Sequence, residues 1–333
     1  MLGYSRCVSA LRDVPLPAGF RVGNATLPGK ATGCTVVICP PGSRGGVDVR
    51  GGGTGTRELE PLAPLANAEG PSAVVLAGGS AFGLACADGV VRWLEERRVG
   101  RATPLGVVPL VPTAVVFDET AGAFGMRPGS DDGYAACEAA RAGVPERGRI
   151  GAGAGAMVGK LRGRERATLG GIGYAALGLA NGVTIAAVAV ANAFGDVLAE
   201  DGTVLGGPHG DDGGLLRSAD LIPRTLELPA RASGPGENTT LVCICTDASL
   251  DKRGCGIVAR VASAGIARAV NPAFTPADGD ITFCVAAGTE AAPPPGPAAS
   301  WALIAVGTAA ATVTAAAIRD AIAHSSGSQP PPY

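Results

Sequence analysis

Histidine is the scarcest chemically useful residue in this sequence. Only His209 and His324 occur among 333 residues, the first in a Gly/Asp-rich loop and the second near a polar end. A metal site built from several imidazoles is therefore excluded. A Ser-His-Asp triad would have to recruit one of these two residues. If the protein is a hydrolase, the sequence predicts that its base is another kind of group.

An excess of charge of either sign is also missing. The chain has 27 Lys and Arg against 29 Asp and Glu, for a net charge of −2, and the two signs are interspersed. Nucleic-acid binding depends on a clustered basic patch, and so does attraction to an anionic membrane surface. We therefore expect neither a nucleic-acid partner nor a membrane partner.

Paired cysteines and a secretion signal are absent as well. The nine cysteines include no CxxC pair, and their odd number and spacings suit neither a zinc site nor a disulfide framework. Buried free thiols in a reducing compartment are the expected state. The N-terminal stretch "MLGYSRCVSALRDVPLP" lacks the apolar core of a signal peptide. The sequence thus predicts a cytoplasmic protein.

Apolar residues, by contrast, are abundant at 47%, enough for a large core. Two segments, 84–98 and 256–270, have helical periodicity; in the second, Ile257, Val261 and Ala264 are expected to form the buried stripe. Six short runs rich in β-branched residues predict strands: 35–39, 73–79, 114–117, 183–190, 241–245 and 281–287. Since these elements do not alternate regularly, we predict a layered α/β fold rather than a Rossmann fold.

The C-terminal part contains one long apolar segment. The proline-rich connector 291–297 precedes a stretch without charge up to Ile318, which has the length of a membrane span. Because it consists mostly of Ala, Thr and Gly, we predict a packed helix instead. The polar, glycine-rich residues 207–238 are expected to form an exposed loop, and 325–333 a disordered tail.

Glycine-rich motifs occur at three places. "GAGAGAMVGK" (151–160) fails the phosphate-loop pattern, because Ala154 stands where Gly is required and Leu161 replaces Ser/Thr. A relaxed dinucleotide pattern fits the segment, but no clear strand precedes it. The alternatives are a tight turn packed on other backbone, or a turn that delivers Lys160 to a site.

The other two motifs, 46–58 and 76–90, join strands to glycines, which permit close approach of a substrate or of another backbone. Ser80 in the second is a possible nucleophile, although "GGSAFG" is not the G-x-S-x-G elbow.

The junction "GENTTLVCIC" places two threonines at the start of an apolar strand. Asn238 begins a glycosylation sequon, but N-glycosylation requires secretion, and the sequence shows no secretion signal. A plain turn into a strand is a second interpretation. In a third, the Thr239 hydroxyl attacks the preceding carbonyl and the chain cleaves itself. The freed α-amine, with a pKa of about 7.7–8.0, then serves as the base for its own hydroxyl, which replaces a histidine.

The order of motifs along the chain supports the third interpretation. The sequence resembles the DmpA-type L-aminopeptidase/D-esterase (β-aminopeptidase) family of self-cleaving N-terminal-nucleophile hydrolases, which includes nylon-oligomer hydrolases. The resemblance runs through most of the chain, in "FRVGNATL", "GCTVVICP", "GVDVRGGGTGTRE", "LAGGSAFGLACADGVVRWLEER", "GAGAGAMVGKL", "VANAFGDV", "NTTLVCICTDASL" and "NPAFTPADGDITFCVAAG".

The resemblance implies a single αββα layered sandwich over 1–333, processed into chains 1–238 and 239–333. It implies cleavage between Asn238 and Thr239, with Thr239 as the nucleophile, and it implies no metal or organic cofactor. A homo-oligomer, often a tetramer of processed units, is also implied.

Four further residues match the family's site. The acidic pair Asp278 and Asp280 would orient the threonine and its amine, since carboxylates attract an ammonium. Lys160 matches a site lysine. Asn192 matches an asparagine that donates to the oxyanion, as a preorganised amide can.

One departure concerns the substrate contacts. Phe82 stands where better-known members carry a tyrosine, so a phenolic donor is missing. Phe82 and Ser80 remain the candidates for substrate binding. The expected activity is hydrolysis of short peptides, amino-acid amides or esters, or amino-terminated oligoamides. Exo-acting aminopeptidase and endo-acting 6-aminohexanoate-oligomer hydrolase activities stay open, as do an ornithine acetyltransferase-like acyltransferase and a non-catalytic binding protein.

Overall fold

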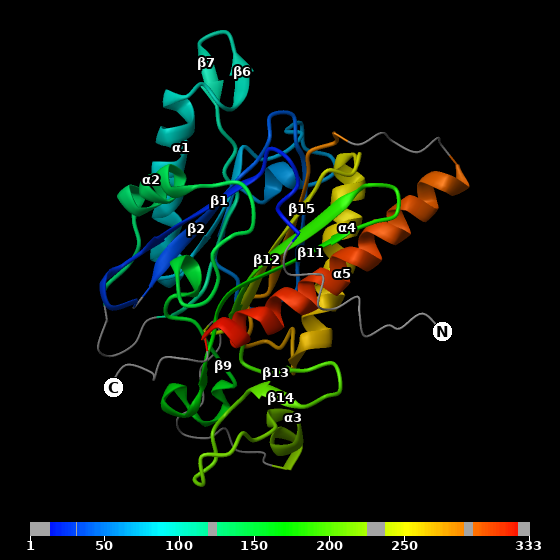
Figure 1. The fold of residues 1–333 in the computed structure, drawn as a ribbon. Helices are drawn as coiled ribbons and strands as arrows, with labels where there is room; N and C mark the ends of the chain where they lie inside the picture. The colour runs from blue at the N-terminus through cyan, green and yellow to red at the C-terminus, as the bar shows by residue number, and fades with distance from the viewer. Residues whose placement is uncertain (1–13, 31, 119–124, 225–236, 290–295, 326–333) are drawn as a thin grey trace.

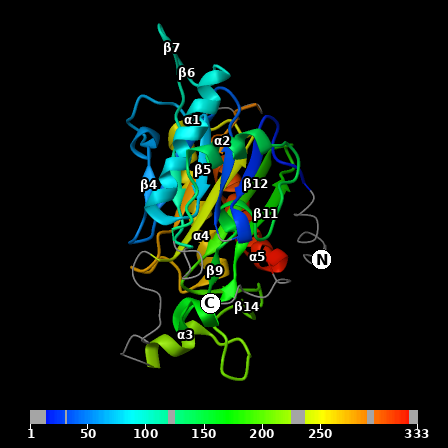
Figure 2. The same cartoon turned by 90° about the vertical axis from the view of Figure 1, so that its left-hand side faces the viewer.

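The protein is described by a computed structural model covering residues 14–30, 32–118, 125–224, 237–289 and 296–325. Its centre consists of two five-stranded sheets packed face to face, with a pair of helices on the outer side of each (Figure 1). Figure 2 shows the same molecule from the side of α1 and α2, which lie in front of the strands. The predicted αββα layered sandwich is confirmed.

The first sheet is mainly antiparallel and carries α1 and α2 on its outer face. Its strands are in the order β1-β2-β5-β8-β4, of which only β5 and β8 run parallel. The bounds are β1 Arg21–Thr26, β2 Gly33–Ile38, β5 Ala73–Ala77, β8 Thr113–Val115, β4 Thr56–Arg57, α1 Cys86–Glu96 and α2 Ser130–Ala139.

The second sheet contains the Thr239 strand and carries α4 and α5 on its outer face. Its order is β11-β12-β15-β17-β3, and β15 and β17 are its parallel pair. The bounds are β11 Gly171–Gly178, β12 Thr184–Asn192, β15 Thr239–Thr246, β17 Ile281–Ala286, β3 Arg44–Val49, α4 Lys252–Ala269 and α5 Pro297–Ser325.

Short elements complete the chain at the two ends of the sandwich. The hairpin β6–β7 lies at the top of Figure 1, and β9, β13, β14 and α3 lie at the bottom. Their bounds are β6 Arg101–Thr103, β7 Gly106–Val108, β9 Met157–Val158, β10 Thr168–Leu169, β13 Asp196–Leu198, β14 Val204–Gly206, β16 Val270–Asn271 and α3 Ser218–Leu221.

Three apolar clusters fill the three spaces between the layers. Successive strand residues point to opposite faces, so Val36 of β2 packs toward α1 and α2 while Val37 packs between the sheets. On the other side, Ile185 and Ile244 pack toward α4 and α5. Because both faces of every central strand are covered, these strands are apolar throughout. That burial explains why all six predicted strands are confirmed, as β2, β5, β8, β12, β15 and β17.

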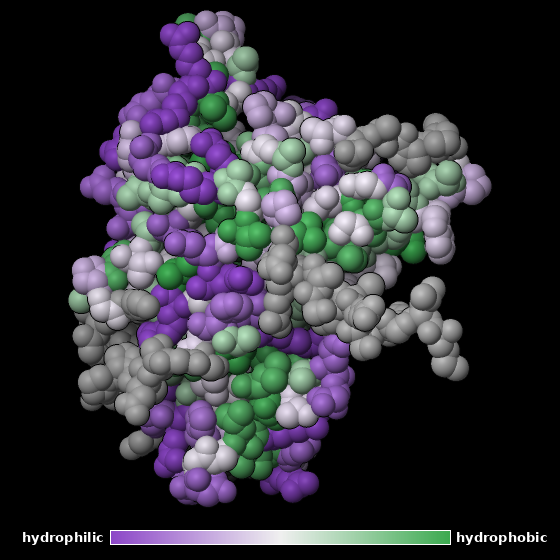
Figure 3. Space-filling view, viewed as in Figure 1, coloured by the Kyte–Doolittle hydropathy of each residue, from purple (hydrophilic) through white to green (hydrophobic). Residues whose placement is uncertain are grey.

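The small residues of α5 allow its backbone to approach the second sheet closely. A Cβ on Gly173 of β11 would lie 1.9 Å from the carbonyl oxygen of Ala317. By length and composition α5 could cross a membrane, yet 56% of its most apolar window is buried inside the protein. Its exposed part includes Trp301, 70% accessible, and Ile304, 57% accessible. Figure 3 shows apolar and polar residues mixed on the face of the protein seen in Figure 1. The expected tail 325–333 lies outside the described residues except Ser325, the last residue of α5.

The predicted stripe of α4 is wrong. The helix begins at Lys252, after Asp251 accepts a hydrogen bond from the N–H of Gly254. Val261 is 38% exposed, and Ala264 is also exposed. The buried face lies about one residue away on the helix and consists mostly of small residues: Cys255, Val258, Ala259, Ala262, Ile266 and Ala269. Small side chains permit close packing against α5, and the buried face combines them with Val258 and Ile266.

The exposed loop predicted for 207–238 is wrong at both ends. Gly207 is buried against the turn at Gly159, where a Cβ would lie 2.4 Å from the Gly207 backbone, and Asn238 is fully buried. Residues 211–215 are exposed as expected, and 225–236 lie outside the described residues.

Candidate active site

Thr239 lies where the ends of three strands of the second sheet meet. It is the first residue of β15 and pairs with Asn192, the last residue of the antiparallel strand β12. On its other side β17 runs parallel, and the preceding turn brings Asp278 into a bridge with Asn238. Asn238 is fully buried and Thr239 is 2% exposed. The sequence "NTT" is thus an interior junction and not a surface turn.

The carbonyl group of Asn238 is held by two hydrogen-bond donors. The Thr239 hydroxyl Oγ1 donates to the Asn238 carbonyl oxygen at 2.5 Å. The backbone N–H of Gly279 donates to the same oxygen at 2.7 Å. The side-chain amide of Asn238 donates to the carbonyl of Ala277 at 3.2 Å, which fixes the residue in the turn. The peptide bond before Thr239 is therefore polarised and lies next to a hydroxyl group.

The turn 277–280 is packed tightly on a glycine-rich loop. The N–H of Gly53 donates to the carbonyl of Asp278 at 2.8 Å, and a Cβ on Gly51 would lie 2.3 Å from the Asp280 nitrogen. The glycines of 46–58 thus permit the close approach of another backbone, one of the two alternatives that the sequence left open.

The two aspartates accept hydrogen bonds mainly from backbone N–H groups. Asp280 accepts from Thr240 at 2.6 Å and from Phe274 at 3.1 Å. Burial, and then the charge of Asp278, raise the pKa of Asp280 to about 7.

Asp278 accepts hydrogen bonds from two segments, the loop after β12 and its own turn. It accepts a hydrogen bond from the N–H of Phe194 at 3.2 Å and one from the hydroxyl of Thr275 at 2.5 Å. Two buried carboxyl groups therefore lie beside the Asn238–Thr239 bond, and the raised pKa of Asp280 lets it keep a proton near neutral pH.

Lys160 reaches this site from the glycine turn 151–160. Gly159 adopts a left-handed φ of 69°, and the following lysine side chain is fully buried. Its ammonium donates to the backbone and side-chain oxygens of Asn192, both at 2.9 Å, and to the carbonyl of Glu237 at 3.1 Å. Burial lowers the pKa of Lys160 well below its usual value, and Arg164 lowers it further. The glycine turn 151–160 thus places Lys160 next to Asn192, which agrees with the second of the two interpretations of this motif.

The amide of Asn192 has a fixed orientation. Its Oδ1 accepts from Lys160 and from the N–H of Met157 at 3.1 Å, while its Nδ2 donates to the carbonyl of Phe117 at 3.0 Å. Since Asn192 pairs with Thr239 in the sheet, the structure brings together Thr239, Asn238, Asp278, Asp280, Lys160 and Asn192.

Asp118 is a residue of this region that the sequence analysis missed. It follows β8 directly after Phe117, is fully buried, and accepts a hydrogen bond from the N–H of Gly79 at 2.8 Å through Oδ1. Its second oxygen is buried beside the Thr32 hydroxyl. Burial raises the pKa of Asp118 to about 6, although both Thr32 and the charge of Arg164 lower it. The charge of Asp118 raises the pKa of Lys160. The available sequence signal was an aspartate immediately after the strand "AVVF".

Ser80 and Phe82 lie in a 3₁₀ turn next to Gly79. Ser80 has a left-handed φ of 54° and donates its N–H to the carbonyl of Val116 at 2.9 Å. Phe82 is 58% exposed, and the Arg127 guanidinium stacks on its ring at 3.4 Å from the centroid. No hydrogen bond joins either residue to Thr239 within the described part of the chain, and their role in substrate binding stays a prediction.

Comparison with known proteins identifies the family. The model of peptidase family S58 matches residues 9–329. An uncharacterized aminopeptidase of Mycobacterium tuberculosis is 43% identical over 311 residues, which cover 87% of this chain and 85% of that protein. A 6-aminohexanoate-oligomer endohydrolase of Agromyces sp. is 32% identical over 276 residues, covering 80% of this chain and 72% of that protein.

Solved structures agree with the fold. The L-aminopeptidase D-Ala-esterase/amidase of Ochrobactrum anthropi, described as a variant of the Ntn hydrolase fold, superposes with a TM-score of 0.66 at 20% identity, over 92% of this chain and 84% of that one. A β-aminopeptidase of Burkholderia sp. gives a TM-score of 0.65 at 24% identity, with the same coverage. The family match, the sequence relatives and the shared Ntn fold together show that this chain belongs to peptidase family S58 and is a hydrolase of amide bonds.

Proposed function

We propose that the chain cleaves itself between Asn238 and Thr239 and then hydrolyses amides with Thr239 as its nucleophile. The observation that carries this proposal is the pair of donors at one carbonyl oxygen, the Thr239 hydroxyl at 2.5 Å and the Gly279 N–H at 2.7 Å. Oγ1 attacks the carbonyl carbon of Asn238, and the Gly279 N–H stabilises the negative charge that develops on the oxygen.

The self-cleavage then proceeds through an ester. The bond from the Asn238 carbonyl to the Thr239 nitrogen breaks, the nitrogen takes up a proton, and the acyl group stays on Oγ1. Water hydrolyses this ester and releases chain 1–238, and Thr239 becomes the N-terminus of chain 239–333. The new α-amine has a pKa of about 7.7–8.0, which suits a general base for the adjacent hydroxyl.

In the processed enzyme the same groups serve the substrate. The Thr239 hydroxyl forms an acyl-enzyme with the carbonyl carbon of the substrate, the amine leaves with a proton, and water releases the acid. Asn192 is the proposed oxyanion donor, with its orientation set by Lys160 and Met157. Asp278 and Asp280 flank Thr239 and hold its amine in place.

The preferred substrates are short peptides, amino-acid amides or esters, and amino-terminated oligoamides. The carboxylate of Asp118 is buried in the same region, and its negative charge suits a substrate ammonium. The 43% identical relative is named as an aminopeptidase, which favours the exo-acting alternative. The second candidate is an endo-acting oligoamide hydrolase, favoured by the 32% identical relative that is named for that reaction.

The first test is the state of the purified chain. We expect a denaturing gel and intact-mass spectrometry to give two fragments, residues 1–238 and 239–333. Thr239→Val keeps the shape and removes the hydroxyl, so it should stay full length and lack activity. Thr314→Val is the matched control, because Thr314 is also fully buried, lies in α5, and its hydroxyl has no hydrogen-bond partner among the described residues. A full-length wild-type chain, or a cleaved Thr239→Val variant, would overturn the proposal.

The second test separates the activities. The processed protein is assayed with L-alanyl and D-alanyl amides, a β-alanyl dipeptide, and linear and cyclic 6-aminohexanoate oligomers. Release of single N-terminal residues supports the aminopeptidase, whereas cleavage of the cyclic oligomers supports the endo-acting candidate. Acyl transfer to glutamate or ornithine without hydrolysis would instead indicate an acyltransferase.

A further inference from the structure

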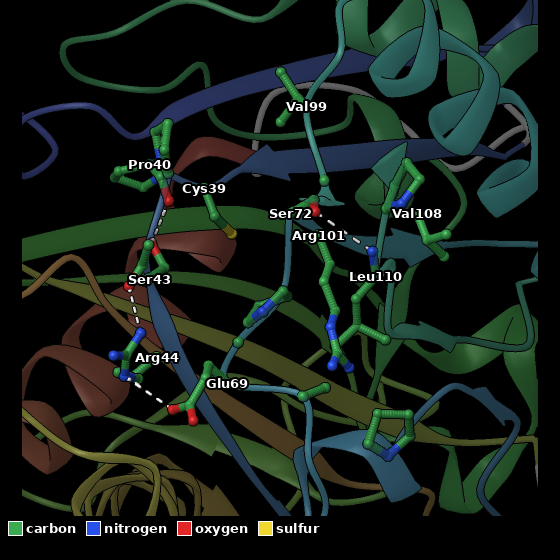
Figure 4. A pocket seen from close by; sticks show the side chains of 18 of the residues that line it. Cys39, Pro40, Ser43, Arg44, Glu69, Ser72, Val99, Arg101, Val108 and Leu110 are labelled. Carbon is green, nitrogen blue, oxygen red and sulfur yellow. Dashed lines mark hydrogen bonds and ion pairs between the residues drawn. The ribbon is translucent and has the colours of Figure 1, made fainter. Parts of the chain in front are cut away.

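A cavity lies at the opposite end of the β-sandwich from Thr239. Its volume is about 680 Å³, within the range of roughly 300–1,000 Å³ that is usual for small-molecule sites. Four segments line it, and Figure 4 shows it from close by: 39–44, 67–72, 98–101 and 108–110, together with Glu58 and Pro61. The cavity therefore lies at the base of the β6–β7 hairpin, at the top of Figure 1.

Continuous strands separate this cavity from the candidate active site. Arg44 lines the cavity at the start of β3, while Arg50, just beyond its end, donates its N–H to the carbonyl of Asp280 at 2.9 Å. Six residues of extended chain span roughly 20 Å. In the first sheet, Leu110 lines the cavity before β8, and Phe117 after β8 accepts from Asn192. One small molecule therefore cannot occupy both places.

The cavity holds positive charge that the protein leaves without a partner. Arg44 forms an ion pair with Glu69 at 3.1 Å, and Glu58 accepts the N–H of Val111 at 2.8 Å. Arg98 and Arg101 have no ion-pair partner within the described residues, and Figure 4 shows Arg101 extending its guanidinium between Leu110 and Glu69. A planar guanidinium with free donors matches a carboxylate through two parallel hydrogen bonds.

The remaining walls are largely apolar. Prolines and aliphatic side chains make up much of the lining: Pro40, Pro41, Pro61, Pro71, Val99, Val108, Pro109 and Leu110. The hydroxyl of Ser72 accepts the N–H of Leu110 at 3.4 Å, so its own proton is available to a ligand. This combination suits an anion with an apolar body better than a small inorganic ion.

One strained backbone position lies at the same place. Glu58 adopts a left-handed φ of 56° and lines the cavity, a conformation that is unfavourable for residues other than glycine and is found at ligand-binding and active sites. The φ of 55° at Arg98 belongs instead to the C-terminal cap of α1, where its N–H donates to Glu95 and the N–H of Val99 donates to Leu94. The strain at Glu58 is independent of the charge and of the volume.

We propose that this cavity is a binding site for a small organic carboxylate with an apolar body, distinct from the site of amide hydrolysis. The Arg101 guanidinium pairs with the carboxylate, Arg98 adds positive charge, and the proline and aliphatic walls enclose the body. The proposal does not depend on Thr239 being the nucleophile.

The test is isothermal titration calorimetry on the full chain with three probes. Hexanoate has both the charge and the apolar body, hexanamide has the body alone, and inorganic phosphate has the charge alone. We expect saturable binding of hexanoate and affinities at least tenfold weaker for the other two. Arg101→Gln should weaken hexanoate binding about tenfold or more, the effect of losing one charge-assisted hydrogen bond. Arg260→Gln, at an exposed position of α4, removes the same charge elsewhere and should change nothing.

Several results would overturn the proposal. Equal binding by wild type and Arg101→Gln would place the ligand elsewhere, and loss of binding in Thr239→Val would place it in the active site. If phosphate bound more tightly than hexanoate, the ligand of this cavity would be an inorganic anion and not an organic carboxylate. If circular dichroism shows that Arg101→Gln does not fold, Arg98→Gln takes its place, and an unchanged affinity in that variant counts against the site.

Discussion

The backbone N–H of Gly279 donates a 2.7 Å hydrogen bond to the carbonyl oxygen of Asn238, the residue before Thr239. The two residues are far apart in the sequence, but Asn238 directly precedes β15 and Gly279 lies two residues before the start of β17, its parallel neighbour. Parallel strands bring their N-terminal ends to the same edge of a sheet. The donor that the proposed self-cleavage needs is therefore supplied by the strand topology.

Substitution of Gly279 should slow self-cleavage. A Cβ at this position would lie 2.5 Å from the Gly53 carbonyl oxygen and 2.8 Å from Thr239 Oγ1, so Gly279→Ala displaces the turn and its N–H. Loss of one oxyanion donor costs roughly 10²–10³ in rate, and we expect a cleavage rate at least tenfold lower by time-resolved gel analysis. Gly256→Ala, where an added Cβ meets nothing within 4 Å, is the control. Equal rates in both variants would remove Gly279 from the mechanism.

The ionisation of Asp280 should make the stability of the uncleaved chain depend on pH. Its pKa is raised from 3.8 to about 7 in the folded protein. Between these two values the folded state keeps a proton that the unfolded state has lost, so the free energy of unfolding falls as pH rises from about 4 to about 7. Three pKa units correspond to roughly 4 kcal/mol at most.

Urea unfolding at pH 5 and pH 8 measures this effect in a Thr239→Val background, in which the chain stays intact. Asp280→Asn cannot titrate, so the stability of the double variant should fall less between the two pH values. Lys160, with its lowered pKa, contributes with the opposite sign in both proteins and cancels in the comparison. Identical pH dependence with and without Asp280 would contradict the raised pKa.

Two buried lysines allow a matched comparison of roles. Lys160 donates to three oxygens of Asn192 and Glu237, and Lys252 donates to the carbonyls of Pro61, Ala66 and Ala68 at 2.6–2.8 Å. Lys160→Met removes one of the two donors to Asn192 Oδ1, and we expect cleavage and amide hydrolysis to fall at least tenfold.

Lys252→Met should act on stability alone. Leaving three carbonyls without their charged donor costs about 3 kcal/mol, read as a lower urea midpoint, while the cleavage rate of the folded protein stays near that of wild type. If Lys160→Met behaves in the same way as Lys252→Met, the role of Lys160 is structural.

Asp118 should select substrates that carry a free amino group. Asp118→Asn removes the charge and keeps the shape, and kcat/KM for an alanyl amide should fall about tenfold or more, the cost of a lost buried charge pair. The N-acetylated amide has no ammonium, so its kcat/KM should change little. A parallel loss for both amides would show that Asp118 supports the fold of the site and not substrate recognition.

Local sequence predicted the strands well and one helix face poorly. The central strands are covered on both faces, so a short β-branched run is sufficient to identify them. Among the strands that were missed, β11, "GIGYAALG", has Gly171, Gly173 and Ala175 on the face toward α5, because that helix passes close to it at Gly173. The same close packing misled the prediction for α4, where small residues carry the contact and Val261 is exposed. The cytoplasmic location and the homo-tetramer stay predictions.

The sequence by itself determined which residue types were available for chemistry. Two histidines, an Asn-Thr-Thr junction at the start of an apolar strand, a lysine after a glycine turn and an Asp-Gly-Asp turn can all be read from the chain. Only the tertiary structure decided that these distant segments meet. It did so because β15 lies between β12 and β17, which places Asn192 on one side of Thr239 and the 278–280 turn on the other. Asp118 and the arginine-lined cavity could not be found from spacing, since burial and the convergence of strand ends belong to the folded sheets and to no single segment.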